Sequence, residues 1–153
     1  MLLNTIIKKT PIPIVALILA LTAAGNLVLS YSTTLRNIFG IIAAIFLLIF
    51  LIKIVKYPNK VFQDLKNPVM ASVFPALSMA LMILATYIKP LSSSLASIIW
   101  YTGLALHLIL IIDFTRKYLL GFKVHSVFPS WFIVYVGIVA GSVTAPAVDN
   151  IYL

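Results

Sequence analysis

Long apolar segments alternate with short polar segments along this chain. Five apolar runs are nearly free of charge, and they span 10–35, 37–52, 67–88, 90–112 and 124–148. A helix needs about 20 residues to cross a bilayer. The second run reaches that length if Lys53 snorkels, with its stem along the lipid and its ammonium group in the interface. The pattern therefore predicts an all-α membrane protein with five transmembrane helices.

We expect one transmembrane domain over 1–153, with helices at about 11–33, 37–55, 68–88, 94–115 and 129–147. The first run is much longer than the apolar region of a cleaved signal peptide, which has about 7–15 residues. It is therefore predicted to be a retained helix.

Composition excludes a soluble domain. The chain is 63% hydrophobic and 9% charged, whereas soluble domains have roughly 25% charged residues. Its 11 basic and 3 acidic residues give a net charge of +8, which in a soluble protein would suggest a nucleic acid partner. Here the positive-inside rule explains the excess, because the basic residues gather in particular loops. We therefore expect the lipid bilayer as a partner and no nucleic acid.

The same basic residues predict the orientation. With a cytoplasmic N-terminus, nine basic residues lie inside and two, Arg36 and Lys89, lie outside. The nine are Lys8, Lys9, Lys53, Lys56, Lys60, Lys66, Arg116, Lys117 and Lys123. This bias predicts a multi-pass protein of the cell membrane whose short C-terminal tail lies outside.

Proline and small residues divide the helices into two kinds. Pro11, Pro68 and Pro129 mark the starts of the first, third and fifth helices at spacings of 57 and 61 residues (68−11 and 129−68). These helices are rich in small residues, whereas the second and fourth are bulky and aliphatic. The repeat predicts two and a half helical hairpins, with proline-kinked odd helices inside and even helices facing lipid.

The third helix carries Pro75 well inside its apolar run. A proline there frees a backbone carbonyl, which is tolerated only against protein or a water-filled cavity. We therefore expect this helix to form an inner wall. Polar, aromatic and proline residues of the odd helices are the candidates for a transport path. They are Asn26, Phe74, Pro75, Ser78 and Pro146.

Alternatives remain open for several of these residues. Asn26 either faces the path or bonds to a neighbouring helix, and Phe74 either narrows a pore or packs. His107 either contacts a proton or ligand, or is a hydrogen-bonded histidine packed between helices. The chain has no cysteine, no paired carboxylates and no Ser/His/Asp grouping. We therefore expect no enzyme activity, no cofactor and no metal site.

Three stretches, 68–80, 100–110 and 129–146, resemble the tellurite-resistance/dicarboxylate transporter family, whose relatives include fungal malate and sulfite transporters and plant slow anion channels. The resemblance implies a ring of hairpins with ten helices, a central pore that a phenylalanine blocks, and trimers. This chain matches only the N-terminal half of that fold. The gating phenylalanine lies on a later helix with no counterpart here, so Phe74 is not given that role.

The resemblance implies transport of small anions or organic acids, of the C4-dicarboxylate (malate), sulfite or tellurite class, by a transporter or channel. The chain would then be a truncated or split half, which needs a complementary C-terminal half or homo-oligomer. The alternative is a non-transporting membrane subunit, a scaffold or an inactive fragment.

Overall fold

A computed structural model describes residues 2–120 and 127–146, and these residues form helices and turns without a β-strand. The chain begins with a short helix, α1 (Leu2–Lys9). The helices that follow are α2 (Ile14–Leu27) with the 3-10 turn η1 (Val28–Ser30), α3 (Thr33–Lys56), α4 (Pro58–Asp64), α5 (Pro68–Val73), α6 (Ala76–Ile88), α7 (Ser93–Phe114) with the π-helical turn η2 (Thr115–Leu119), and α8 (Trp131–Thr144). The predicted all-α class is confirmed.

Three helical segments of the described residues are long and apolar enough to cross a membrane: Thr33–Lys56, Pro68–Ile88 and Ser93–Leu119. Ile14–Ser30 and Trp131–Thr144 are shorter apolar helices. The last turns of α3 and α7–η2 and the segments beside them carry most of the basic residues. We call this side the lysine-rich end, after Lys8, Lys9, Lys53, Lys56, Lys60, Lys66 and Lys117.

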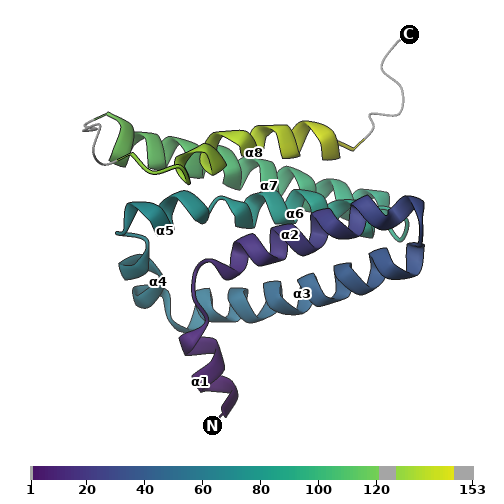
Figure 1. The fold of residues 1–153 in the computed structure, drawn as a ribbon, viewed down its shortest axis with the longest axis horizontal. Coiled ribbons are helices and arrows are strands. Elements are labelled where there is room, and N and C mark those ends of the chain that lie inside the picture. The colour runs from purple at the N-terminus through teal and green to yellow at the C-terminus, as the bar shows by residue number, and fades with distance from the viewer. Residues whose placement is uncertain (1, 121–126, 147–153) are drawn as a thin grey trace.

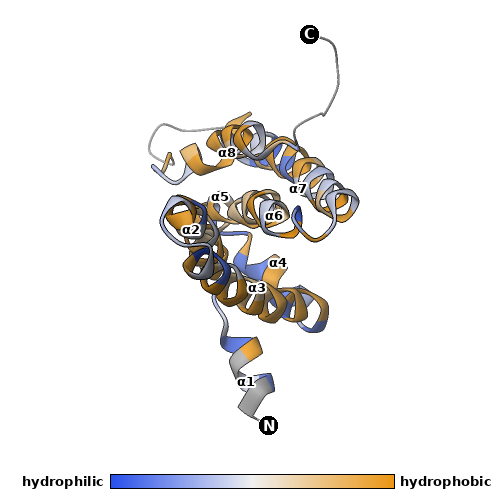
Figure 2. Ribbon diagram, turned by 90° about the vertical axis from the view of Figure 1, so that its right-hand side faces the viewer, coloured by the Kyte–Doolittle hydropathy of each residue, from blue (hydrophilic) through white to orange (hydrophobic). Residues whose placement is uncertain are grey.

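The helix α6 lies at the centre of the bundle. It contacts α2 on one side and α7 and α8 on the other, while α3 packs mainly on α2. Figure 1 shows the long helices side by side, with the α2–α3 hairpin on one side of α6 and the α7–α8 pair on the other. The helix α1 departs from this direction and extends sideways from the bundle (Figures 1 and 2).

Burial separates the inner helix from the outer ones. In its most apolar 18 residues, Pro68–Ile88 is 61% buried, against 28% for α3 and 22% for Ser93–Leu119. The helix α3 is hydrophobic along most of its length (Figure 2), and its exposed residues include Ile41 and Leu48. A largely exposed apolar surface is stable only in lipid or against protein. The exposed apolar surfaces of the even helices therefore suit contact with lipid or with another protein, and their contact with lipid stays a prediction.

Side-chain caps hold the starts of α5 and α7. The Asn67 side chain accepts a hydrogen bond from the Val69 N–H at 2.9 Å, with Pro68 as the first helical residue of α5. Ser92 caps α7 through the Leu95 N–H at 3.3 Å. Each cap satisfies one of the backbone donors that a helix start leaves unpaired.

Lys53 does not snorkel, and that expectation was wrong. Its side chain is fully buried, its Nζ donates to the Thr10 carbonyl at 2.7 Å, and it lies 3.6 Å from an Asp64 carboxylate oxygen. The bulky outer surface of α3 suggested lipid around Lys53, but the residues before α2 and the helix α4 fold over the end of α3. A buried ammonium group needs such partners.

We predict that Lys53→Met lowers the free energy of unfolding by about 1.5–3 kcal/mol, because it removes a charge-assisted hydrogen bond while keeping the side-chain volume. Thermal denaturation in detergent measures the change. The control is Lys66→Met, which removes an exposed lysine at the same end. Equal stability of the two variants would contradict a structural role for Lys53.

Candidate transport path

The helix break at Pro75 is sheltered inside the protein. Between α5 and α6, the N–H of Leu77 bonds the Phe74 carbonyl at 3.0 Å and the N–H of Ser78 bonds the Pro75 carbonyl at 3.1 Å. These are i to i−3 bonds, so the helix tightens where proline removes a donor. The side chain of Pro75 is fully buried, and the break therefore does not face lipid.

Ser78 and His107 form a buried polar pair beside this break. Ser78 Oγ lies 2.6 Å from the Pro75 carbonyl oxygen and 2.8 Å from His107 Nδ1, and both side chains are fully buried. A hydroxyl has one proton. If the Ser78 hydroxyl donates this proton to the Pro75 carbonyl, His107 Nδ1 donates to Ser78 Oγ. If the hydroxyl donates it to the imidazole, Nδ1 accepts.

In either arrangement, His107 Nε2 is buried and has no hydrogen-bond partner among the described residues. Burying such an atom costs free energy. Nε2 faces the backbone of α8 at Gly137, so this nitrogen is enclosed by protein.

A glycine of α8 makes room for this histidine. A Cβ atom placed at Gly137 would collide with Cε1 and Nε2 of the His107 ring. At Gly141, one turn later, the nearest atoms are the side chains of Met82 at 3.4 Å and Leu104 at 3.6 Å, which is ordinary contact. The two glycines thus serve packing, and Gly137 places α8 directly against the imidazole.

A second polar cluster lies at the end opposite to the lysine-rich one. Arg36 Nε donates to Asn26 Oδ1 at 3.0 Å, and its Nη2 donates to the Thr86 carbonyl at 2.8 Å. The Asn26 amide also donates to Thr86 Oγ1 at 3.0 Å. The guanidinium carbon lies 4.2 Å from the centre of the Tyr87 ring, a cation–π distance. Asn26 therefore bonds across to α6.

Arg36 is 7% exposed, and each of these partners is neutral. Both acidic residues in the described part of the chain pair with lysines elsewhere, Asp64 with Lys53 and Asp113 with Lys117. The positive charge of Arg36 is thus not neutralised by a carboxylate within residues 2–120 and 127–146.

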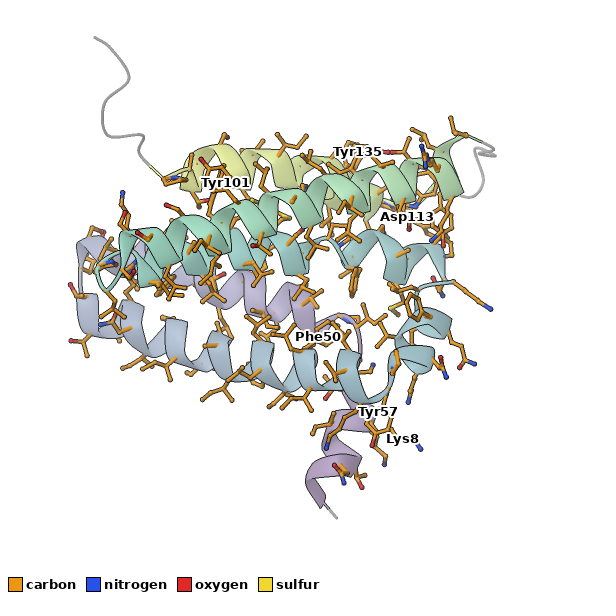
Figure 3. All side chains as sticks on the ribbon, turned by 180° about the vertical axis from the view of Figure 1, so that it is seen from behind. Lys8, Phe50, Tyr57, Tyr101, Asp113 and Tyr135 are labelled. Carbon is orange, nitrogen blue, oxygen red and sulfur yellow. The ribbon has the colours of Figure 1, made fainter. Side chains whose placement is uncertain are left out.

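The remaining two candidates lie in different hollows. Pro146 borders a hollow of about 250 Å³ that Thr86, Lys89, Trp100 and Thr144 also line. Thr86 is the hydrogen-bond partner of Asn26, so Pro146 and Asn26 lie towards the same end. Phe74 borders a cavity of about 670 Å³ at the lysine-rich end. Its ring centroid is 6.2 Å from that of the fully buried Phe50, which Figure 3 labels.

The structure thus places the candidate residues at three levels along the bundle. Pro75, Ser78 and His107 meet in the middle, Asn26 and Pro146 lie towards one end, and Phe74 lies towards the other. Within the described residues, no three side chains of the metal-ligating types come together.

Sequence reasoning missed the part that Arg36 plays, because it counted this residue only as an outside charge. Two features of the sequence indicated a polar cluster around Arg36. One is Asn26, the strongly polar residue of the first helix, and the other is the Thr86-Tyr87 pair near the end of the third. Arg36 lies in the first turn of α3, between these residues in the chain.

We predict that Gly137→Ala destabilises the protein by about 1–3 kcal/mol, the usual cost of overpacking, whereas Gly141→Ala stays close to the parent. Thermal denaturation of both variants in detergent tests this. The effect of Gly137→Ala should shrink in a His107→Ala background, where the clash is removed. Identical losses with and without the histidine would contradict the contact.

The chain is similar in sequence to known membrane proteins. Residues 12–151 match the profile of a family described as voltage-dependent anion channel. Over 116 residues the chain is 28% identical to a protein of Methanocaldococcus jannaschii named an uncharacterized transporter, with 71% of this chain and 34% of that protein covered. The chain thus spans about a third of the length of this curated relative. No solved structure matches.

The family match extends over the stretches on which the resemblance rested, and over most of the chain besides. It covers the buried break at Pro75, the Ser78–His107 pair and the Arg36 cluster. This multi-pass membrane protein belongs to the voltage-dependent anion channel family.

Proposed function

We propose that this chain forms part of a path for small anions or organic acids across the cell membrane, with a cytoplasmic N-terminus. The substrate classes are C4-dicarboxylates such as malate, sulfite and tellurite. The family match over residues 12–151 carries the proposal. The inner helices α2, α5–α6 and α8 would line the path.

The chemistry of the inner helices supports an anion path without fixed charges in the middle. The helices α2, α5, α6 and α8 contain no charged residue. Selectivity would then come from hydroxyl groups, backbone dipoles at the helix break and the His107 imidazole. Pro75, Ser78 and His107 are our candidate contacts there, as Asn26, Phe74 and Pro146 are towards the two ends.

The charge of Arg36 would give the path a preference for anions over cations. Its guanidinium is largely buried and bonded only to neutral groups, so its positive potential is less screened than that of a solvated side chain. Arg36 donates a hydrogen bond to Asn26, which is one of the path candidates. An anion that passes this end of the bundle would be attracted.

The exposed face of α8 supports a partner that completes the path. Gly137 and Gly141 pack inward, whereas Phe132, Val139 and Val143 on the other side are 57–80% exposed. We propose that this face meets a complementary C-terminal half or further copies of the chain. The alternative function, a non-transporting subunit, scaffold or inactive fragment, would leave the face to lipid.

We predict that the purified protein reconstituted in liposomes, in the oligomeric state that it has in detergent, carries anions from a panel of chloride, malate, sulfite and tellurite. Pro75→Ala restores the missing N–H and straightens the break, and Ser78→Ala removes a hydroxyl group. Each should reduce that flux about threefold to tenfold, a change equivalent to one hydrogen bond. The matched control is Ile45→Ala on the lipid-facing side of α3. Fluorescent or isotopic efflux measures the rates.

Absence of flux for the whole panel, from protein that is folded and oligomeric, would contradict transport by this chain and favour the scaffold alternative. Unchanged flux in both helix-break variants would contradict only the choice of path residues.

We also predict that Arg36→Gln lowers the chloride-to-potassium permeability ratio about twofold, whereas Arg36→Lys largely preserves it. A unit charge contributes ~0.4 kcal/mol to an ion ~10 Å away in water. Reversal potentials in asymmetric KCl give the ratio, which a purely structural loss would not shift. Lys89→Gln at the same end is the control, and an equal shift there would contradict a special position for Arg36.

A further inference from the structure

The helix α1 was not predicted, and it builds a hollow at the lysine-rich end. Pro11 and Pro13 separate it from α2, and it extends across the direction of the spanning helices (Figures 1 and 2). A helix with this direction at the end of a transmembrane bundle lies in the plane of the membrane surface. Ile7, near its end, is buried, whereas Lys8 and Lys9 are exposed.

Two lysines from the far end of α3 and from α4 fix α1 in place. Lys60 Nζ donates to the Lys8 carbonyl at 3.2 Å, and Lys56 Nζ lies 3.4 Å from Asn4 Oδ1. Both contacts join segments 52 residues apart in the chain. The positive-inside rule accounts for the number of lysines at this end, but not for their convergence around one space.

That space is a hollow of about 450 Å³, and we call it the basic hollow. It is lined by Asn4, Thr5, Lys8, Lys9, Tyr57 and Lys60. Figure 3 shows Lys8 and Tyr57 close to each other beside α1. The lining contains three lysines together with amide, hydroxyl and phenol groups, and it contains no carboxylate.

The charge of the basic hollow is not balanced by the described part of the chain. Asp64 pairs with Lys53 and Asp113 pairs with Lys117, both outside the hollow. Several ammonium groups that surround one space repel each other, and an anion between them relieves that repulsion. Lysine ammonium groups act as point charges for phosphate, and neutral donors add hydrogen bonds.

We propose that the basic hollow binds a phosphate group, and that its source is the headgroup of an anionic phospholipid. The in-plane direction of α1 and the adjoining last turn of α3 place the hollow at the level of the headgroups. Tyr57 has the amphipathic ring that is typical of this level. The volume exceeds that of a phosphate ion alone and leaves room for the glycerol part of a headgroup. This site is independent of the proposed transport.

Native mass spectrometry of the detergent-purified protein, titrated with short-chain phosphatidylglycerol, tests the proposal. Lys8→Gln/Lys9→Gln removes two charges from the hollow without touching the bonds of Lys56 and Lys60 that hold α1. Each lysine near a membrane surface attracts anionic lipid, so we expect binding about tenfold weaker or more. The control Lys66→Gln/Arg116→Gln removes two exposed charges at the same end, and it should change binding by less than about twofold.

Competition separates the two sources of phosphate. Retention of phosphatidylglycerol in the presence of ~10 mM inorganic phosphate, with phosphatidylcholine not bound at this site, would support a lipid headgroup. Displacement by inorganic phosphate would assign the hollow to a soluble phosphate and overturn the lipid source. Equal binding in the hollow variant, the control variant and the parent would overturn the site itself.

Discussion

The backbone of a protein in a bilayer must satisfy its own polar groups, because lipid offers none. Pro75 interrupts a helix inside that environment, and it is tolerated because α2, α7 and α8 cover α6. At the break, the Phe74 carbonyl accepts the N–H of Leu77, and the Pro75 carbonyl accepts the N–H and the hydroxyl of Ser78. The central position of α6, and with it the order of the neighbouring helices, follows from this one requirement.

Buried cations then hold the α2–α3 hairpin at both of its ends. Lys53 donates to the carbonyl before α2, and Arg36 donates to Asn26 of α2 and to the Thr86 carbonyl of α6. Each cation satisfies a backbone acceptor where a chain segment changes direction. Of these two cations, only Lys53 has a carboxylate nearby, that of Asp64. The charge of Lys53 is therefore balanced, whereas that of Arg36 is not balanced by a carboxylate of the described residues. This difference gives Arg36 its proposed role towards anions.

The apolar pattern was enough to predict the helical class and the burial of the helix that carries Pro75, because burial in a membrane depends mainly on side-chain bulk and polarity. The caps at Asn67 and Ser92 could also be predicted, since they are local. The burial of Lys53 could not be predicted, because its Nζ donates to the carbonyl of Thr10, which is 43 residues away in the chain. The contact of His107 with Ser78 and Gly137 joins three helices, and one sequence does not show which faces meet.

The central claim, that α6 is sheltered while α3 meets lipid, can be tested with tryptophan fluorescence and brominated lipids. Trp100 packs on Met79 and Met82 of α6 and is 9% exposed, whereas Ile41 at a similar depth on α3 is 62% exposed. We compare a Trp131→Phe variant with one that also carries Trp100→Phe and Ile41→Trp. The account predicts weak quenching of Trp100 and strong quenching of the reporter at position 41. Equal quenching of the two would contradict it.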